Sequence, residues 1–167
     1  MDILSELKIF GEILAAVVLG GIIGIEREIA DKPAGFRTHM LVAASSCFLV
    51  GSGQWILREF YLEGYESYIR ADPTRIIQAL IVGLTFLGAG TIIQRTKTET
   101  VEGLTTAASL LLTGIIGMSV AVEKYIIAVL VTGLSLFILR GVGFVERWAT
   151  SKRRQVKKRM NDMMNHE

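Results

Sequence analysis

Apolar residues fill five stretches of the chain, and charged residues gather between them. A helix that spans a membrane needs roughly 20 mostly apolar residues, with a range of about 17–25. The five stretches meet this requirement, and we expect transmembrane helices at about residues 9–25, 38–57, 76–93, 104–122 and 125–145. The pattern therefore predicts an all-α integral membrane protein whose membrane domain covers residues 1–145.

The first apolar stretch could be read as a signal peptide. Its leader, residues 1–8, is not basic, and Glu-Arg-Glu follows it instead of a small-residue cleavage site. We therefore interpret it as a retained span.

Residues 146–167 differ from the rest because they are hydrophilic and strongly basic. Apolar residues recur among them at helical spacing, which predicts a short basic C-terminal helix. Three interpretations remain open for this tail. It could lie on anionic lipid, contact a partner or a second copy, or be solvated and only set the topology.

Composition agrees with a membrane protein, since 51% of the 167 residues are apolar. The net charge of +2 gives no reason to expect nucleic-acid binding. Cys47 is the single cysteine, so an intrachain disulfide and a cysteine metal site are excluded. With two histidines, no phosphate-binding glycine loop and no Ser–His–Asp set, we expect no enzyme.

Basic residues are distributed unevenly between the two sides of the predicted membrane domain. If the amino terminus is outside, the inner segments carry 13 Lys and Arg and the outer segments carry 5. Cytoplasmic segments are usually the more basic ones. We therefore expect an external amino terminus and a cytoplasmic carboxyl terminus.

The chain contains a sign of internal duplication. An offset of 68 residues aligns Gly20 with Gly88, Arg27 with Arg95, and Thr38 with Thr106, without a gap. Both copies have the order apolar helix, arginine, loop, glycine and threonine. We therefore predict a duplicated helical hairpin in which helices one and three run in the same direction.

Small and polar residues suggest how the helices pack. Gly20 and Gly24 form a small-xxx-small pair, which allows another helix to approach closely. The small residues Gly88 to Gly90 predict that helix three is central and closely packed. Helix four carries a polar face, for which we favour helix packing over an ion path. That face consists of Glu102, Thr106, Ser109, Thr113 and Gly117.

Charged residues gather at the ends of the predicted helices. Asp72 precedes a proline, which indicates an N-cap of helix three, whereas Arg75 has no such local explanation. The two inner loops hold many charged and hydroxyl groups, which could either bind Mg²⁺ through oxygen atoms or form ion pairs. Asp72 and Glu102 are the candidate metal ligands, and a membrane core of roughly 30 Å would keep them apart.

Four blocks of sequence resemble the signatures of the MgtC/SapB family. The blocks are Gly-Gly-Ile-Ile-Gly-Ile-Glu-Arg-Glu at 20–28 with Ala-Gly-Phe-Arg-Thr-His at 34–39, Asp-Pro-Thr-Arg-Ile at 72–76, Phe-Leu-Gly-Ala-Gly at 86–90, and Gly-Leu-Thr-Thr-Ala-Ala at 103–108. The resemblance implies a bacterial inner-membrane protein of adaptation to low Mg²⁺ and, in pathogens, of virulence. It implies the membrane domain of such proteins without the soluble ACT-type domain that many members add. The positions that would carry family function are Glu26, Arg27, Glu28, Arg37, Thr38, His39, Asp72, Arg75, Glu102, Thr105 and Thr106.

Three hypotheses follow for the activity. The leading one is a non-enzymatic regulator that contacts its own copies or other membrane proteins, for which the resemblance implies the proton-driven ATP synthase. The alternative is a transporter or channel for Mg²⁺ or another cation. The third is a structural membrane protein without a ligand. We expect no cofactor, with Mg²⁺ binding left open.

Overall fold

The computed structural model describes residues 3–62, 72–95 and 100–142. The basic tail at 146–167, with its predicted helix, lies outside the described residues.

Five α-helices account for most of the described chain. They are α1 (Ile3–Ile29), α2 (Phe36–Leu62), α3 (Pro73–Ala89), α4 (Leu104–Ala121) and α5 (Tyr125–Leu136), and α5 continues into a π-helix, η2 (Phe137–Val142). By length and composition, α1, α4 and the Phe36–Leu57 part of α2 could each cross a membrane, and α3 and α5 are shorter apolar helices. The chain is thus an all-α membrane protein, as its apolar pattern predicted.

The connection between α3 and α4 differs from the prediction. Helix three was expected to reach Ile93, but α3 ends at Ala89, and the chain then forms two short antiparallel strands. These are β1 (Ile93–Arg95) and β2 (Thr100–Glu102). A short apolar run such as that around Ile93 fits a strand as well as a helix end, which explains the error. Gly103 has φ of +96°, a conformation that favours glycine, and it brings the chain from β2 into α4.

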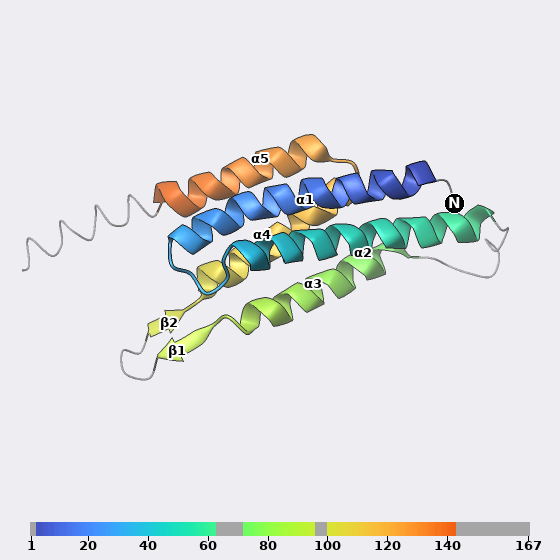
Figure 1. The fold of residues 1–167 in the computed structure, drawn as a ribbon. Coiled ribbons are helices and arrows are strands. Elements are labelled where there is room, and N and C mark those ends of the chain that lie inside the picture. The colour runs from blue at the N-terminus through green and yellow to red at the C-terminus, as the bar shows by residue number, and fades with distance from the viewer. Residues whose placement is uncertain (1–2, 63–71, 96–99, 143–167) are drawn as a thin grey trace, which may run out of the picture.

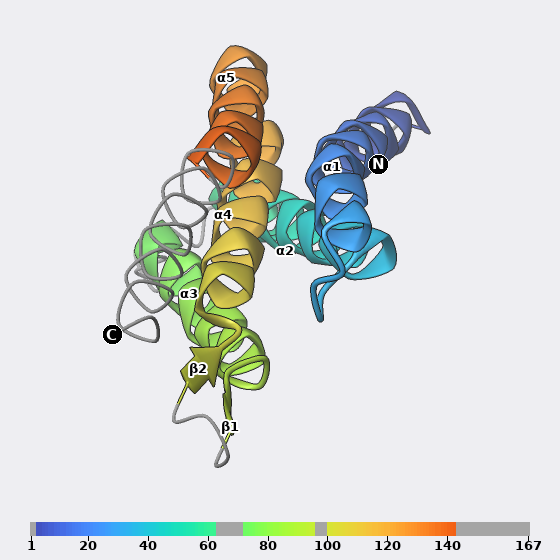
Figure 2. The same ribbon diagram turned by 90° about the vertical axis from the view of Figure 1, so that its left-hand side faces the viewer.

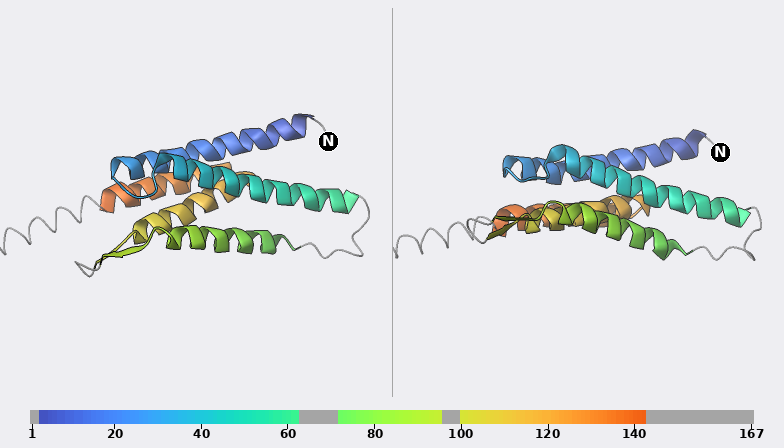
Figure 3. Two further views of the ribbon diagram at one scale, coloured as in Figure 1. Left: turned by 60° about the horizontal axis from the view of Figure 1, so that its bottom comes forward. Right: turned by 90° about the horizontal axis from the view of Figure 1, so that it is seen from below.

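The helices alternate in direction and form two layers. Figure 1 shows that α1, α3 and α5 run one way, and that α2 and α4 return. Seen from below in Figure 3, α1 and α2 form one layer, and α3, α4 and α5 form the other. Figure 2 shows α4 between α3 and α5 within their layer, with α1 and α2 to one side and with β1 and β2 at one end of the bundle. We call this end the hairpin end; it also holds the turn at 30–35.

α4 is the central helix because its hydroxyl and glycine face lies against α1 and α2. Thr106, Ser109 and Thr113 are buried on this face, and Thr113 bonds to the carbonyl of Ser109 within the helix. At Gly117, an added Cβ would lie 2.3 Å from the carbonyl oxygen of Ala43, so the backbones of α4 and α2 are in direct contact. The part of the predicted polar face from Thr106 to Gly117 therefore packs between helices, as expected. Glu102, which was assigned to the same face, lies before α4, exposed in β2.

α3 is not the central element that its small residues predicted. Leu84 and Gly88 are its buried residues, and most of the others are exposed. Gly90 is exposed at the end of α3, and an added Cβ there would meet only carbonyls of its own helix. Of the two glycines, Gly88 thus packs against α4 and Gly90 does not, a difference that sequence spacing cannot reveal.

Equivalent glycines make equivalent contacts in the two halves of the predicted duplication. An added Cβ on Gly20 would lie 2.6 Å from the backbone of His39, and one on Gly88 would lie 3.2 Å from Ala107. His39 and Ala107 are themselves related by the 68-residue offset. The two helix pairs, α1–α2 and α3–α4, therefore cross at corresponding points.

Candidate functional site

The turn at the hairpin end fixes the relative position of α1 and α2. Glu28, near the end of α1, accepts a hydrogen bond from the backbone N–H of Phe36 at 2.8 Å. This N–H is one of the unpaired donors at the start of α2, so the Glu28 carboxylate acts as its cap. An added Cβ on Gly24 would lie 2.7 Å from the Cα of Phe36, and one on Gly35 would lie 2.9 Å from Glu28. Both glycines therefore lie at close contacts between the end of α1 and the start of α2.

Glu26 and Arg27 form a buried ion pair at the end of α1. The Nε of Arg27 donates to one carboxylate oxygen of Glu26 at 2.6 Å, and a terminal guanidinium nitrogen donates to the other at 2.9 Å. The side chains are buried, with exposed fractions of 8% for Glu26 and 3% for Arg27. Two parallel hydrogen bonds of this kind suit the planar guanidinium, and each charge compensates the other away from water.

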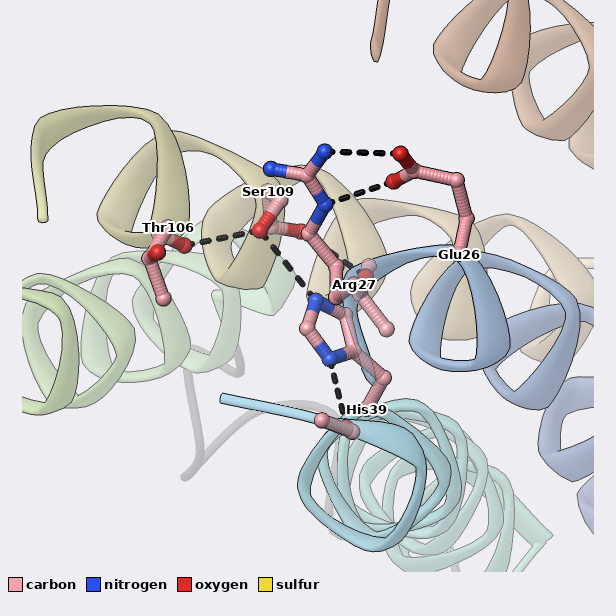
Figure 4. A network of polar contacts seen from close by, with 7 residues as sticks. Glu26, Arg27, His39, Thr106 and Ser109 are labelled. Atoms are coloured by element: carbon pink, nitrogen blue, oxygen red, sulfur yellow. Dashed lines mark hydrogen bonds and ion pairs between the residues drawn. The ribbon is translucent and has the colours of Figure 1, made fainter. Parts of the chain in front are cut away.

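His39 connects α2 to α4 beside this ion pair. Its ring is fully buried; Nδ1 lies 2.9 Å from the carbonyl oxygen of Gly35, and Nε2 lies 3.2 Å from the Oγ of Ser109. Ser109 in turn lies 2.8 Å from the carbonyl oxygen of Thr106. Figure 4 shows these groups gathered where α1, α2 and α4 meet. We call Glu26, Arg27, His39, Thr106 and Ser109 the polar centre.

A cavity of about 130 Å³ adjoins the polar centre between α1, α4 and the end of α5. Ile23 lines it from α1, Ser109 and Leu112 from α4, and Ile138 and Leu139 from η2. A π-helical segment widens the helix locally and is often found at functional sites. The cavity thus lies where α5 departs from regular α-helical geometry.

The polar centre contains four of the eleven predicted motif residues: Glu26, Arg27, His39 and Thr106. The other seven have different positions. Arg37 is exposed and Thr38 half-buried at the start of α2, and Thr105 is exposed on α4 at the rim of the cavity. Glu28 caps α2, Glu102 lies exposed in β2, and Asp72 and Arg75 lie at the start of α3, away from the hairpin end.

Asp72 accepts hydrogen bonds from the backbone N–H of Thr74 at 2.9 Å and from its hydroxyl at 2.6 Å. These bonds lower the pKa of the Asp72 carboxyl, and the carboxylate caps α3. Asp72 and Glu102, the two candidate metal ligands, lie beyond opposite ends of α3 (Figure 1) and cannot share one ion. Among the described residues, no group of three or more His, Cys, Asp and Glu could hold a metal ion.

A second polar cluster lies at the end of the bundle opposite the hairpin end. Tyr125 donates to the buried carboxylate of Glu12 at 3.2 Å, and Lys8 forms an ion pair with Glu123. The Lys8 hydrogen bond lowers the pKa of Glu123. These contacts join α1 to the turn between α4 and α5, so Glu12 has a structural partner there.

The contact between Ser109 and His39 was not predicted from the sequence. Ser109 was assigned only to the polar face of helix four, and it lies 70 residues from His39 in the chain. The spacing on α4 could have indicated that Ser109 faces inward, but not which helix it meets. Likewise, a bidentate pair between neighbours such as Glu26 and Arg27 is not expected from helical spacing.

The fold and the polar centre define a class of protein: a helical integral membrane protein with a buried charged and hydroxyl-bearing centre at one end. Comparison with known sequences makes this more specific. Residues 13–148 match the model of the MgtC family, and the chain belongs to this family.

Several relatives are known. The chain is 36% identical to an uncharacterized protein of Haemophilus influenzae, over 96% of this chain and 66% of that protein. It is 34% identical to YhiD of Escherichia coli K12, which carries the name of a proposed magnesium transporter, over 76% of this chain and 56% of that protein. It is 34% identical to SapB of Bacillus subtilis, over 90% and 59% respectively. The chain thus spans about two thirds of these relatives or less, and no solved structure matches it.

Proposed function

We propose that this chain is a non-enzymatic membrane protein of magnesium adaptation that regulates other membrane proteins by contact and does not conduct an ion. The magnesium link rests on the family and on the name of the relative YhiD. The resemblance supports placement in a bacterial inner membrane, and the excess of Lys and Arg in the segments predicted to be inside supports a cytoplasmic hairpin end. Further copies of the chain and the proton-driven ATP synthase are the partners to test first.

The observation that carries this proposal is the largely apolar layer between the two polar clusters. Glu12 lies toward one end of the bundle and the polar centre toward the other. The described side chains buried between them are mostly apolar, with the hydroxyls of Ser46 and Thr113 among them and no charged group; the apolar ones include Ala16, Ala43, Cys47, Ile116 and Val120. A hydrated cation would have to lose its water there with few replacement oxygen ligands and no carboxylate, which is costly. This favours contact over conduction.

The alternative is a transporter or channel for Mg²⁺ or another cation. It is favoured by the name of YhiD and by the hydroxyl-bearing face of α4. Transport would require the apolar layer to open, or copies of the chain to enclose a path between them.

Mg²⁺ flux into sealed proteoliposomes separates these proposals. The unmodified chain is compared with Asp72→Ala and Glu102→Ala, and insertion is checked by protease protection. We expect no flux above that of empty vesicles. Saturable flux that falls in either variant would replace the proposal with transport.

Growth at low Mg²⁺ tests the regulatory role itself. Cells that lack their own family member are complemented with this chain or with a variant of the polar centre, Arg27→Gln. The regulatory proposal expects rescue by the unmodified chain and recovery of a membrane partner after cross-linking, with both reduced in the variant. Rescue without a recoverable partner would contradict it.

A further inference from the structure

The hydrogen bonds at His39 require more protons than the neutral side chains can supply. Three contacts form one series: Nδ1 to the Gly35 carbonyl, Nε2 to the Ser109 hydroxyl, and that hydroxyl to the Thr106 carbonyl. Carbonyl oxygens only accept, so each contact needs its own proton from His39 or Ser109. A neutral imidazole has one N–H and a serine has one O–H. Two protons therefore serve three contacts.

The neutral ring leaves one of these contacts without a proton. Nδ1 carries the ring proton because it faces a carbonyl. Ser109 then donates either to Nε2 or to the Thr106 carbonyl, but not to both. If it donates to Thr106, the lone pairs of Nε2 and of the serine oxygen face each other. A ring protonated on both nitrogens satisfies all three contacts at once, because Nε2–H donates to Ser109 and Ser109 donates to Thr106.

The charged neighbours of the ring are Glu26 and Arg27 of α1, which lie beside it (Figure 4). The carboxylate of Glu26 would favour a second proton on the ring, and the guanidinium of Arg27 would oppose it. These two groups neutralise each other through their bidentate pair. From α4, the ring meets the hydroxyl of Ser109. The hydrogen bonds to the charged ring would be charge-assisted and shorter than neutral ones, and they oppose the cost of burying it.

We propose that His39 is a proton-binding site, and that the bound proton completes the hydrogen-bonded series from Gly35 to Thr106 and makes the existing His39–Ser109 contact between α2 and α4 charge-assisted. The proton comes from water and takes the lone pair of Nε2, which gives an imidazolium. The hydroxyl proton of Ser109 then turns from Nε2 to the Thr106 carbonyl. Loss of the proton to water reverses both changes, and no other bond forms or breaks. The site responds to acidity and does not depend on whether the chain regulates or transports.

The full chain in lipid nanodiscs, labelled with ¹⁵N-histidine, allows a direct test by NMR. The sequence has two histidines, His39 and His166, so His166 serves as an internal reference and His39→Gln assigns the signals. Ring ¹⁵N shifts distinguish the two neutral tautomers from the imidazolium. Across about pH 5 to 8, where histidine ordinarily titrates, we expect His39 to pass from the Nδ1–H tautomer to the imidazolium. A ring that keeps one neutral form over this range would overturn the proposal.

Two variants of Ser109 make the test specific. Ser109→Ala removes the acceptor for Nε2–H, and we expect proton affinity at His39 to fall about tenfold, which moves the titration midpoint by about one unit. Ser109→Thr keeps the hydroxyl, and its midpoint should stay within about 0.3 unit of the unmodified chain. If His39 titrates with the same midpoint in both variants, the Ser109 hydroxyl does not stabilise the bound proton. If Ser109→Ala does not fold, the titration of the unmodified chain still decides the proposal.

Discussion

The Glu26–Arg27 ion pair offers a direct test of how the hairpin end is stabilised. The perturbation is removal of one charge at a time, with Glu26→Leu and Arg27→Met, followed by both together. Each single change leaves a charge buried without its bidentate partner, because Arg27 is 3% exposed and Glu26 is 8% exposed. The double variant leaves neither charge behind.

The expected magnitudes follow from this burial. Breaking a buried ion pair by removing one partner costs about 3–5 kcal/mol of folding free energy. Replacing both partners by apolar side chains of similar volume is often neutral or stabilising. We therefore expect each single variant to lose about 3 kcal/mol or more, and the double variant to lose less than either. Such a result would show strong coupling between the two side chains.

Reversible unfolding in mixed micelles, followed by circular dichroism as SDS is added, measures these differences. Arg37→Met is the matched control, because Arg37 is an exposed arginine near the same end of the bundle. It should change stability by no more than about 0.5 kcal/mol. If the single variants of the buried pair lose less than about 1 kcal/mol, as exposed ion pairs do, the pair is effectively solvated and the reasoning fails.

Three further predictions concern packing, an unpaired hydroxyl and acidity. Gly117→Ala should destabilise the chain by about 1–3 kcal/mol, because its Cβ would lie 2.3 Å from the Ala43 carbonyl oxygen. A Cβ at Gly133 would meet nothing within 4 Å, so Gly133→Ala should be neutral or stabilising by up to about 1 kcal/mol. The same unfolding assay compares the two variants. Ser46 has a buried hydroxyl with no hydrogen-bond partner among the described residues. Ser46→Ala should therefore be at least as stable toward unfolding as the unmodified chain, and a clear loss of stability would show that the hydroxyl has a partner. Folding lowers the pKa of the Asp72 carboxyl below its ordinary value of 3.8. The stability that the Asp72 cap contributes is therefore fully present at pH values above 3.8, and it is lost as the pH falls through the pKa of the folded state. Amide exchange at the start of α3 should speed up in acid, and Asp72→Asn, which still caps, should remove this acid dependence.

The sequence predicted the elements of the fold better than their arrangement. Long apolar runs located the helices because a membrane span must bury its backbone polar groups in helical hydrogen bonds over a fixed length. The turn from α3 into β1 was missed because the run at Ile92 and Ile93 is apolar in either structure. The central position was assigned to α3 instead of α4, since small residues show that a close contact exists but not which helix makes it.

The polar centre was also predicted only in part, because the sequence does not show which helices meet. The charges of Glu26 and Arg27 at a helix end were visible in the sequence, and so was the polar face of α4. The contact of the α4 face with His39 depends on how α2 crosses α4. That crossing in turn depends on the contact between Gly117 and Ala43. Such a crossing is a property of packed surfaces, and spacing within one helix does not determine it.

The equivalent glycine contacts of the two helix pairs allow the two halves of the predicted duplication to be compared. Gly20 and Gly88 make corresponding crossings, yet the partner of the first is His39 and the partner of the second is Ala107. The position equivalent to Ser109 in the first half is Leu41, and the one equivalent to Glu26 in the second half is Gln94. One half therefore contributes the ionisable groups and the other the hydroxyls, and neither half contains a polar centre of its own. If the two hairpins arose by duplication, the single polar centre is a product of divergence between the copies.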